Sequence, residues 1–358
     1  MRPSRSRTTG HGKSKNASPL PMDGEAPRIA VIGAGISGLT CATEIAKLGC
    51  GVSVLDKARG PGGRMSTRRV PDLGVGADFD HGAQYFTVRS PELSSRVEQW
   101  SSEGVVAPWH GRIVALGPDG VEESSGITRR VVGTPGMNAI CQRLAAGLDT
   151  RLGVQVSSIE SDGDAWTVLD RAGDNVGTFE KVICTAPAPQ TEKLLRGIAP
   201  ELADRAAAVQ MQPCWSVLLA FDAPIPVDFD GAFVNHGPLS WVARTSAKPA
   251  RQTPPDRWVL HAGPSWSEAH LEDDAEPVVE ALVAAFFDAL DARPSQPAWC
   301  KGHRWRFALA QNPLADGCFY DRRLGIGACG DWANGNRVEG AFLSGLRLAQ
   351  EIERALDR

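Results

Sequence analysis

The sequence lacks long apolar runs and carries little net charge. None of its apolar runs approaches the ~20 residues that a membrane-spanning helix requires, and the N-terminus has no apolar core of the kind found in secretion signals. The 38 basic and 42 acidic residues give a formal net charge of −4, which provides no general attraction to nucleic acid. We therefore expect a cytoplasmic protein that binds neither membrane nor nucleic acid.

Metal-binding patterns are also missing. The eight cysteines form no C-x-x-C pair, and the seven histidines show no H-x-x-x-H spacing. Most cysteines lie in apolar segments, so reduced, buried thiols are favoured over disulfides and over a zinc site. Tyrosine is scarce as well, because Tyr85 and Tyr320 are the only two in 358 residues.

Glycine, in contrast, is abundant, and three glycines form the clearest motif. Gly33, Gly35 and Gly38 follow an apolar run at 29–32 with the spacing G-x-G-x-x-G. In this pattern the first glycine allows a tight turn, the second lets the backbone approach a pyrophosphate, and the third lets a helix pack on a strand. A helical pattern and a second apolar strand follow and end at Asp56, about twenty residues on, where a ribose diol needs an acceptor. Together these features predict a dinucleotide-binding unit; a glycine-rich turn that binds nothing is the alternative.

A basic loop comes directly after Asp56. It contains a glycine-rich turn at 60–63 and four arginines, which are Arg59, Arg64, Arg68 and Arg69. Its position after the ribose-binding acid favours a phosphate-binding role, with Arg64 beside a pyrophosphate or a ribityl chain. A solvated basic loop is the alternative.

The glycine triplet, the acid and the GGRM sequence at 62–65 resemble the opening signature of the flavoprotein oxidoreductases that include monoamine oxidases and phytoene desaturases. Later segments resemble one branch of that superfamily, the bacterial renalase-like proteins. These segments are DHGAQYFTVR (80–89), GTPGMNAI (133–140), TAPAPQ (185–190), WVARTSAKP (241–249) and CGDWANGNRVEGAFLSG (329–345). The resemblance covers about residues 28 to 350 and implies FAD as the cofactor.

The resemblance and the residue patterns together predict an α/β fold, in which a Rossmann-type FAD-binding domain is interleaved with an α+β substrate domain, as in the flavin amine oxidases. The FAD-binding domain is assigned to 27–88, 134–190 and 318–358, and the substrate domain to 89–133 and 191–317. The basic segment 1–26 is predicted to be a disordered tail, with a transit peptide or an overlong start as alternatives. The oligomeric state is not predicted.

Apolar periodicity predicts the main elements. The predicted strands cover 29–32, 52–55, 154–159, 166–169, 179–184, 214–221, 231–234, 239–243, 258–263 and 326–329, and the predicted helices cover 37–48, 136–148, 277–290 and the residues from Thr191 and from Val338 onward. Between 91 and 132, short strands and turns alternate, which predicts a β-rich insertion.

The resemblance also implies which residues contact the cofactor. Asp331 is expected near the ribityl or pyrophosphate group, with a helix cap as its alternative role, and Tyr85 is expected near the flavin ring, with core packing as the alternative. The full predicted set is Gly33, Gly35, Ile36, Ser37, Gly38, Asp56, Lys57, Gly63, Arg64, Gln84, Tyr85, Phe86, Val156, Ala186, Gly330, Asp331, Val338, Glu339, Gly340 and Ala341.

The renalase-like branch implies an oxidase of misreduced nicotinamide dinucleotides, the 2- and 6-dihydro isomers of NAD(P)H. A hydride passes to flavin N5 and the electrons then reduce O₂ to hydrogen peroxide, so no catalytic acid or base is predicted. The alternative is an FAD-dependent amine oxidase or a related C–N or C–C dehydrogenase. The scarcity of tyrosine weakens amine oxidation, because amine oxidases usually frame the amine between two tyrosines. A non-catalytic flavin-binding redox sensor is an alternative of another class.

A small dinucleotide substrate implies cations that bind its pyrophosphate. The predicted substrate-binding residues are Tyr85, Trp241, Arg244, Lys248 and Arg304, with Arg306 as a further candidate. Solvated surface charge is the alternative role for each of these cations.

Overall fold

The computed structural model contains the parallel sheet that the N-terminal motif predicts. It describes residues 27–74, 76–118, 120–123 and 129–357, so the predicted tail lies outside the described residues. The strand order is β10 (Asp149–Leu152), β2 (Gly51–Asp56), β1 (Arg28–Ile32), β14 (Lys181–Cys184), β21 (Ile326–Ala328) and β20 (Phe319–Asp321). All neighbours in this order are parallel except β20, which is antiparallel to β21.

Both faces of this sheet are covered, which explains the unbroken apolar sequence of β1. The covering elements are α1 (Ile36–Lys47), α3 (Ala139–Ala145), α4 (Ala188–Leu195), α5 (Pro200–Ala207), α8 (Val338–Leu356) and the antiparallel strands β11 (Val156–Asp162), β12 (Ala165–Asp170) and β13 (Asn175–Phe179). Ile29 and Val31 pack in one core with α1, α3 and α8. Ala30 and Ile32 pack in a second core with α4, α5 and β12. Side chains alternate across a strand, so β1 contributes to both cores.

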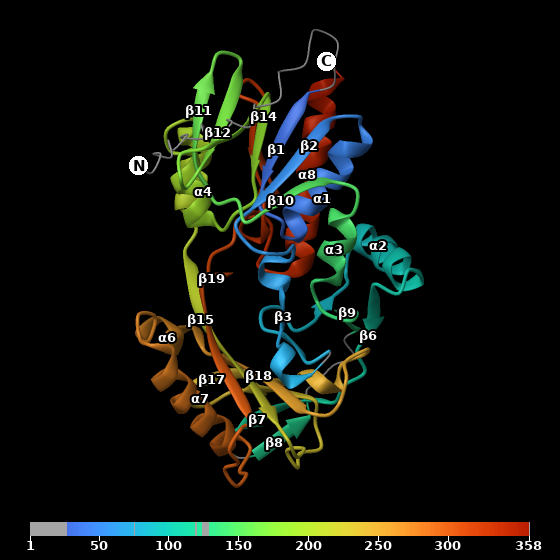
Figure 1. Cartoon of the computed structure of the whole chain (residues 1–358), viewed down its shortest axis with the longest axis vertical. Coiled ribbons are helices and arrows are strands. Elements are labelled where there is room, and N and C mark those ends of the chain that lie inside the picture. Colours follow the sequence, from blue (N-terminus) through green and yellow to red (C-terminus); the bar gives the residue numbers. More distant parts are fainter. Residues whose placement is uncertain (1–26, 75, 119, 124–128, 358) are drawn as a thin grey trace, which may run out of the picture.

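A second sheet forms the other half of the molecule (Figure 1). Its order is β19 (Trp299–Ala310), β15 (Met211–Phe221), β18 (Asp256–Ala262), β17 (Leu239–Arg244), β16 (Gly231–Val234), β7 (Ile113–Gly117) and β8 (Gly120–Glu123). Val217, Leu219 and Phe221 of β15 pack in one core with α7 (Ala275–Ala289). Leu218 and Ala220 pack on the opposite face. The sheet therefore has one face covered by a helix and one that turns toward the dinucleotide-binding half.

The predicted β-rich insertion is wrong at its start, because residues 91–102 form helix α2 (Pro91–Ser102). Ser90 caps this helix by accepting a hydrogen bond from the Leu93 N–H, and Pro91 occupies its first turn, where no N–H is needed. Leu93, Val97 and Trp100 are its buried residues, with the spacing of a helix face. Trp100 contacts Phe342 of α8, so α2 packs on the dinucleotide-binding half.

Short elements connect the two halves. These are the hairpin of β3 (Thr67–Arg69) and β4 (Asp78–Asp80), and the sheet of β5 (Phe86–Thr87), β9 (Arg130–Gly133) and β6 (Val106–Pro108). The remaining short elements are helix α6 (Pro264–Ala269), which packs on β15, and the 3₁₀ turns η1 (Gly63–Met65), η2 (Pro71–Leu73), η3 (Thr245–Ala247) and η4 (Asp331–Ala333). No helix in the described ranges is both long and apolar enough to cross a lipid bilayer. The described structure is a mixed α/β fold with a Rossmann-type half, as the sequence predicts.

Candidate active site

The three glycines form a backbone cradle at the N-terminus of α1. A Cβ at Gly38 would overlap the carbonyl oxygen of Gly33, so helix and turn are in close contact there. A Cβ at Gly35 would meet no atom within 4 Å, so the space beside this residue is open. No side chain caps α1, which leaves its first N–H groups facing outward with the positive end of the helix dipole. This arrangement fits a pyrophosphate.

Asp56 lies at the end of β2 beside this cradle. Its carboxylate accepts hydrogen bonds from the backbone N–H groups of Ala34, at 2.6 Å, and Ala58, at 2.7 Å. The backbone N–H of Val154 donates to the Asp56 carbonyl oxygen at 2.9 Å, which brings the chain just before Val156 to the same edge of the sheet. Asp56 and Val156 therefore lie near each other, as the FAD assignment requires.

Arg64 and Asp331 come from opposite ends of the chain and form a bidentate ion pair. The two N–O distances are 2.7 and 2.5 Å, and Arg64 Nη1 also donates to the carbonyl oxygen of Ala308 at 3.0 Å. Asp331 is buried, and the preceding Gly330 N–H donates to Ser344 Oγ on α8. Strand β21 ends shortly before Asp331, and strand β19 contains Ala308, so the two strands place Asp331 and Arg64 beside each other. These are the two residues predicted near the ribityl and pyrophosphate groups.

The N-terminus of α8 lies close to that of α1. A Cβ at Gly345 would overlap the Ser37 carbonyl oxygen, and one at Gly340 would overlap the carbonyl of Gly335. The Glu339 carboxylate accepts from the backbone N–H groups of Arg89 and Ser90 and from Ser90 Oγ, so it binds the start of α2. Burial raises the pKa of Glu339, but these N–H donors outweigh it and the pKa is lowered. Its side chain is therefore occupied within the protein.

Two of the other predicted cofactor residues make hydrogen bonds within the protein, and the rest differ in how exposed they are. Ser37 Oγ donates to Cys329 Sγ at 3.2 Å, and the Ala186 carbonyl accepts from Trp332 Nε1 at 3.1 Å. Lys57 and Gly63 are exposed. The remaining buried or half-buried members are Ile36, Phe86, Val338 and Ala341.

An aromatic cluster lies where the two halves meet. The Tyr85 ring is 5.7 Å from Trp241 and 5.9 Å from Trp109, measured between centroids. Arg130 lies over the Tyr85 ring at 5.5 Å. The indole N–H groups of Trp109 and Trp241 are buried and have no hydrogen-bond partner among the described residues. Sequence reasoning missed Trp109, which lay within the predicted insertion.

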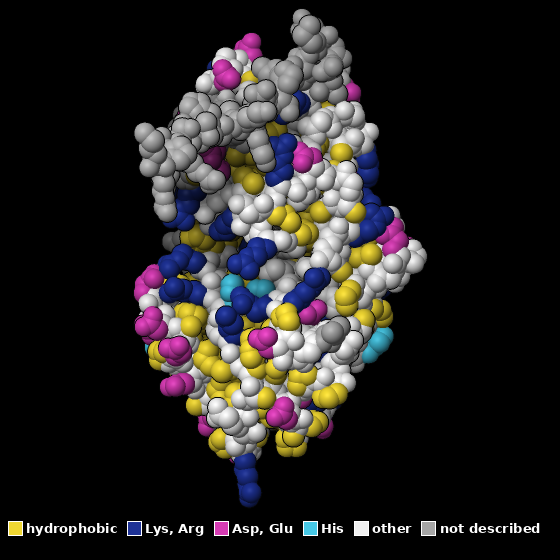
Figure 2. All heavy atoms as spheres, in the orientation of Figure 1, with side chains coloured by type: hydrophobic (Ala, Val, Ile, Leu, Met, Phe, Trp, Pro, Cys, Tyr) yellow, Lys and Arg dark blue, Asp and Glu magenta, His cyan; other side chains and the backbone are white. Residues whose placement is uncertain are grey.

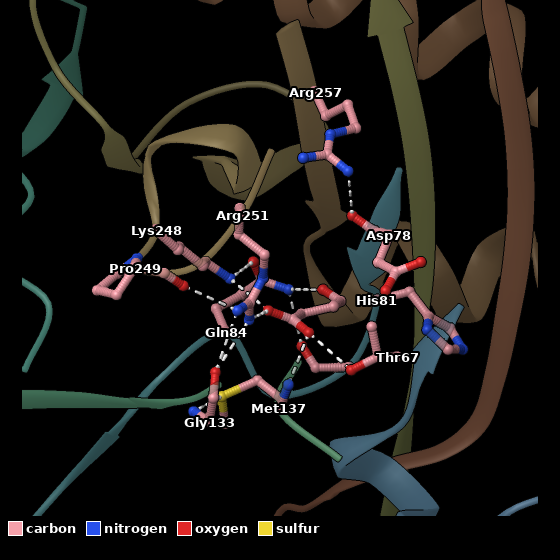
Figure 3. A network of polar contacts seen from close by, with 12 residues as sticks. Thr67, Asp78, His81, Gln84, Gly133, Met137, Lys248, Pro249, Arg251 and Arg257 are labelled. Atoms are coloured by element: carbon pink, nitrogen blue, oxygen red, sulfur yellow. Dashed lines mark hydrogen bonds and ion pairs between the residues drawn. The ribbon is translucent and has the colours of Figure 1, made fainter. Parts of the chain in front are cut away.

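A buried carboxylate, Asp80, pairs with Lys248 and Arg251, and Lys248 lies over the Trp109 ring of this cluster at 5.6 Å. Figure 3 shows Lys248 and Arg251 in one polar network with Gln84 and Thr67. Asp80 Oδ2 is 2.6 Å from Arg251 Nη2 and 3.4 Å from Lys248 Nζ, and Lys248 also donates to Gln84 Oε1 at 3.0 Å. Thr67 Oγ1 donates to the other Asp80 oxygen at 2.8 Å. The sequence motifs contained Asp80, Gln84 and Lys248 but did not show that they meet, because the acid and its cations are some 170 positions apart. Arg251 was missed.

The charges of this cluster shift each other's pKa. Burial alone raises the pKa of Asp80, but Lys248, Arg251 and the Met137 N–H together lower it to about 2. Burial lowers the pKa of Lys248 to about 8, although Asp80 partly opposes this. At neutral pH the cluster therefore holds two cations and one anion.

Three histidines lie nearby, where Figure 2 shows Lys and Arg side chains gathered around histidines at the middle of the molecule. His81 stacks on Trp305 at 5.1 Å and contacts the edge of His303 at 4.7 Å, while His261 faces the His81 carbonyl. Burial lowers the pKa of His81 to about 3 and those of His261 and His303 to about 4, and neighbouring positive charge adds to the shift of His81 and His303. All three are therefore neutral at pH 7.

The predicted pyrophosphate cations do not form one clamp. Arg244 donates to the Ile225 carbonyl, faces Asp256 at 3.3 Å, and borders a 460 Å³ cavity that also contains Asp222 and Asp230. Three carboxylates make that cavity unsuitable for a pyrophosphate.

The other predicted cations are also occupied. Arg304 and Arg306 pair with Glu272, and Lys248 is buried against Asp80. Arg244, Lys248 and Arg304 therefore each contact different partners, and their predicted contact with a substrate stays a prediction.

The cradle, the acid at the end of β2 and the Arg64–Asp331 pair define a flavoprotein of the Rossmann type. The comparisons agree. Residues 31–100 match the model of an NAD(P)-binding Rossmann-like domain, and residues 115–353, about two thirds of the chain, match the model of the flavin containing amine oxidoreductases. The chain belongs to the flavin containing amine oxidoreductase family, and its cofactor is FAD.

Individual relatives are similar in fold or over short stretches. Hydroxyneurosporene desaturase of Rubrivivax gelatinosus is 45% identical over 62 residues, which span 17% of this chain and only 11% of the desaturase. A putative protoporphyrinogen oxidase from Exiguobacterium sp. 255-15 has a TM-score of 0.74 at 15% identity, covering 94% of this chain and 100% of that one. Cyclohexylamine oxidase from Brevibacterium oxydans IH-35A has a TM-score of 0.72 at 12% identity, covering 93% and 100%. At these identities the structural similarity is one of fold.

Proposed function

We propose that the protein is an FAD-dependent oxidase of misreduced nicotinamide dinucleotides, the 2- and 6-dihydro isomers of NAD(P)H. The observation that supports this most is the positive charge beside the aromatic cluster. Lys248 and Arg251 share the single carboxylate of Asp80, and the neighbouring Arg257 donates to the backbone carbonyl oxygens of Gly76 and Asp78. An anionic dinucleotide is attracted to such a site, whereas a protonated amine is repelled.

The aromatic cluster suits a planar, uncharged ring. Tyr85, Trp109 and Trp241 offer ring faces and edges, and the two indole N–H groups have no partner among the described residues. Buried donors without partners are costly, so a ligand acceptor such as the carboxamide oxygen of a dihydronicotinamide would satisfy one of them.

Bound FAD supplies the redox chemistry by accepting a hydride and passing the electrons to O₂. The residues of the chain then have to bind and orient the substrate and keep water away. An electron-rich dihydronicotinamide ring releases a hydride without a proton transfer, and the neutral His81, His261 and His303 need no catalytic role. We therefore assign no acid or base.

Amine oxidation is the second candidate, and the aromatic cluster favours it. Tryptophans flank Tyr85, so the rings that frame a neutral amine are available despite the scarcity of tyrosine. Solved structures similar in fold include a putrescine oxidase, with a TM-score of 0.69 at 16% identity, covering 92% of this chain and 99% of that one. A non-catalytic flavin sensor stays a third possibility that turnover would exclude.

Anaerobic bleaching of the flavin tests these candidates. A mixture of dihydronicotinamide isomers, made by non-specific reduction of NAD⁺, should bleach the FAD-loaded enzyme rapidly and leave NAD⁺. Ordinary 1,4-NADH should react slowly. Its hydride-donating carbon lies opposite the ring nitrogen, so it cannot reach the position over flavin N5 that the donor carbon of the isomers occupies when the rest of the dinucleotide is bound in the same place. Rapid bleaching by putrescine or cyclohexylamine, with none by the isomer mixture, would establish amine oxidation instead. Bleaching by neither, with tight FAD binding, would favour the sensor.

A further inference from the structure

Arg68 is one of the cations at the junction of the two halves, and it has no acidic partner among the described residues. It is half-buried on β3, and no carboxylate in the described ranges lies within salt-bridge distance of it. Its Nη2 is 3.4 Å from His303 Nδ1, and its Nε is buried without a hydrogen-bond partner. Burying guanidinium N–H groups without acceptors is costly unless a ligand accepts hydrogen bonds from them.

The surroundings of Arg68 do not neutralise its charge. His303 and His81, the nearest titratable groups, are neutral at pH 7. Neutral His303 can accept from Arg68, which holds the guanidinium fork in place without cancelling its charge. Trp305 stacks on His81 and adds a flat apolar wall beside the fork.

The position of Arg68 relative to the cofactor cradle suits a long substrate. His303 and Trp305 lie two residues apart on β19 and point to the same side of the sheet. Ala308, further along the same strand, accepts from Arg64 of the Arg64–Asp331 pair. Five residues of extended strand span at most about 16 Å, so His303 and Ala308 hold Arg68 and Arg64 at different places along β19. An anion bound at Arg68 would therefore be separate from the Arg64–Asp331 pair.

We propose that Arg68, oriented by His303, binds the pyrophosphate of the dinucleotide substrate and so determines its specificity. A guanidinium presents paired donors that match two phosphate oxygens, as a lysine ammonium does not. This inference rests on the proposed function for the identity of the substrate. The anion site itself rests only on the contacts of Arg68.

The first test measures binding of inorganic pyrophosphate to the FAD-loaded enzyme by equilibrium dialysis. Arg68→Met should weaken binding about 10- to 100-fold, the range for one charge-assisted contact, and Arg68→Lys should recover it only in part. Arg69→Met is the matched control, because Arg69 is exposed and adjacent strand residues point to opposite faces. The control should stay within about twofold of the wild type.

The second test compares dihydronicotinamide isomers with and without the pyrophosphate, using the dinucleotide and the riboside. Arg68→Met should raise the half-saturating dinucleotide concentration about 10- to 100-fold and leave the limiting bleaching rate nearly unchanged, because a contact with the unreacting pyrophosphate is made equally in ground and transition states. The riboside should respond equally in both enzymes.

The two tests separate the possible failures. Equal pyrophosphate binding by the wild type and Arg68→Met overturns the Arg68 site, even if the isomers bleach the flavin. Loss of FAD affinity in Arg68→Met also overturns it, because Arg68 would then belong to the cofactor site. If pyrophosphate binding depends on Arg68 but no isomer bleaches the wild-type flavin, the anion site stands and the proposed substrate fails.

Discussion

Gly35 and Gly38 are three residues apart, yet their surroundings differ in kind. A Cβ at Gly35 would enter open space, whereas one at Gly38 would overlap backbone. Gly35→Ala should therefore fold with nearly wild-type stability but bind FAD weakly, because the methyl group occupies the place of the pyrophosphate. Gly38→Ala should lower the free energy of unfolding by about 1–3 kcal/mol. Denaturant unfolding of the apoprotein and FAD titration measure the two effects.

Gly197→Ala is the control for this pair, since a Cβ there also meets open space, in the turn between α4 and α5. It should change neither stability nor FAD affinity. Wild-type FAD affinity in Gly35→Ala would contradict the placement of the pyrophosphate at α1.

His81 gives the site a predictable response to acid. Its pKa is lowered from 6.5 to about 3, first by burial and then by His303 and Arg68. Below pH 6.5 the histidine binds a proton in the unfolded chain but not in the folded protein. The contribution of His81 to the free energy of unfolding is therefore fully present above pH 6.5 and decreases as the pH falls. Between pH 7 and 5 the wild type should lose about 2 kcal/mol more than His81→Gln, at about 1.4 kcal/mol per pH unit.

Urea unfolding at several pH values checks this expectation. His110→Gln is the control, because His110 is exposed and the variant should follow the wild-type pH profile. Parallel profiles for His81→Gln and the wild type would mean that the pKa of His81 is the same in the folded and unfolded protein.

At the scale of elements, Glu339 joins two helices. Its carboxylate accepts three hydrogen bonds from Arg89 and Ser90 at the start of α2, although the resemblance implied a contact with FAD. Glu339→Ala should lower the free energy of unfolding by about 1.5–3 kcal/mol, the range for hydrogen bonds to a charged group. Glu339→Gln, which keeps an acceptor, should lose less.

FAD titration of the same variants decides between the two roles. We expect affinity to change less than stability, because the backbone of Glu339 stays in place at the start of α8. A tenfold loss of FAD affinity with unchanged unfolding would restore the cofactor role of the carboxylate.

Helix α2 shows why the interpretation of 91–132 was partly wrong. Ser90, Pro91 and the apolar spacing of Leu93, Val97 and Trp100 are a helix signal that the sequence does contain. The turn residues from Pro108 onward indicate short strands, and the prediction wrongly applied that pattern to residues 91–102 as well. The strands that follow, β6 to β9, agree with the rest of the prediction.

At the scale of the whole molecule, the two halves share a hydrophobic core. Trp241 and Ile113 of the second sheet belong to the same cluster as Ile29 of β1 and Phe342 of α8. We expect one cooperative unfolding transition rather than two. Tryptophan fluorescence reports on both halves and flavin fluorescence reports on cofactor release, so the two signals should change together during thermal unfolding. Excess FAD should raise the midpoint of both.

Two separated transitions would contradict this expectation. A flavin signal that changes well before the tryptophan signal would show that the cofactor site opens locally. The same thermal unfolding measurement without added FAD shows how much of the midpoint temperature depends on the cofactor.

The sequence by itself determined the dinucleotide-binding half. The apolar run of β1, the glycines and Asp56 lie within thirty positions, so the contacts that they make with one another are local. The covered parallel strands also have a distinctive composition, because both faces of each strand are buried. These features predicted a dinucleotide-binding unit; the resemblance to the flavoprotein oxidoreductases added FAD and the fold class, and the family confirms both.

Only the tertiary structure decided which charges are available in the site. Arg64 meets Asp331, and Asp80 meets Lys248 and Arg251, across separations that no local pattern encodes. The sequence shows how many cations a segment has, but the cost of burying a charge depends on which partner the fold places beside it. For that reason only the folded chain shows that Arg244, Lys248 and Arg304 have separate partners, and that Arg68 of the basic loop has no acidic partner among the described residues.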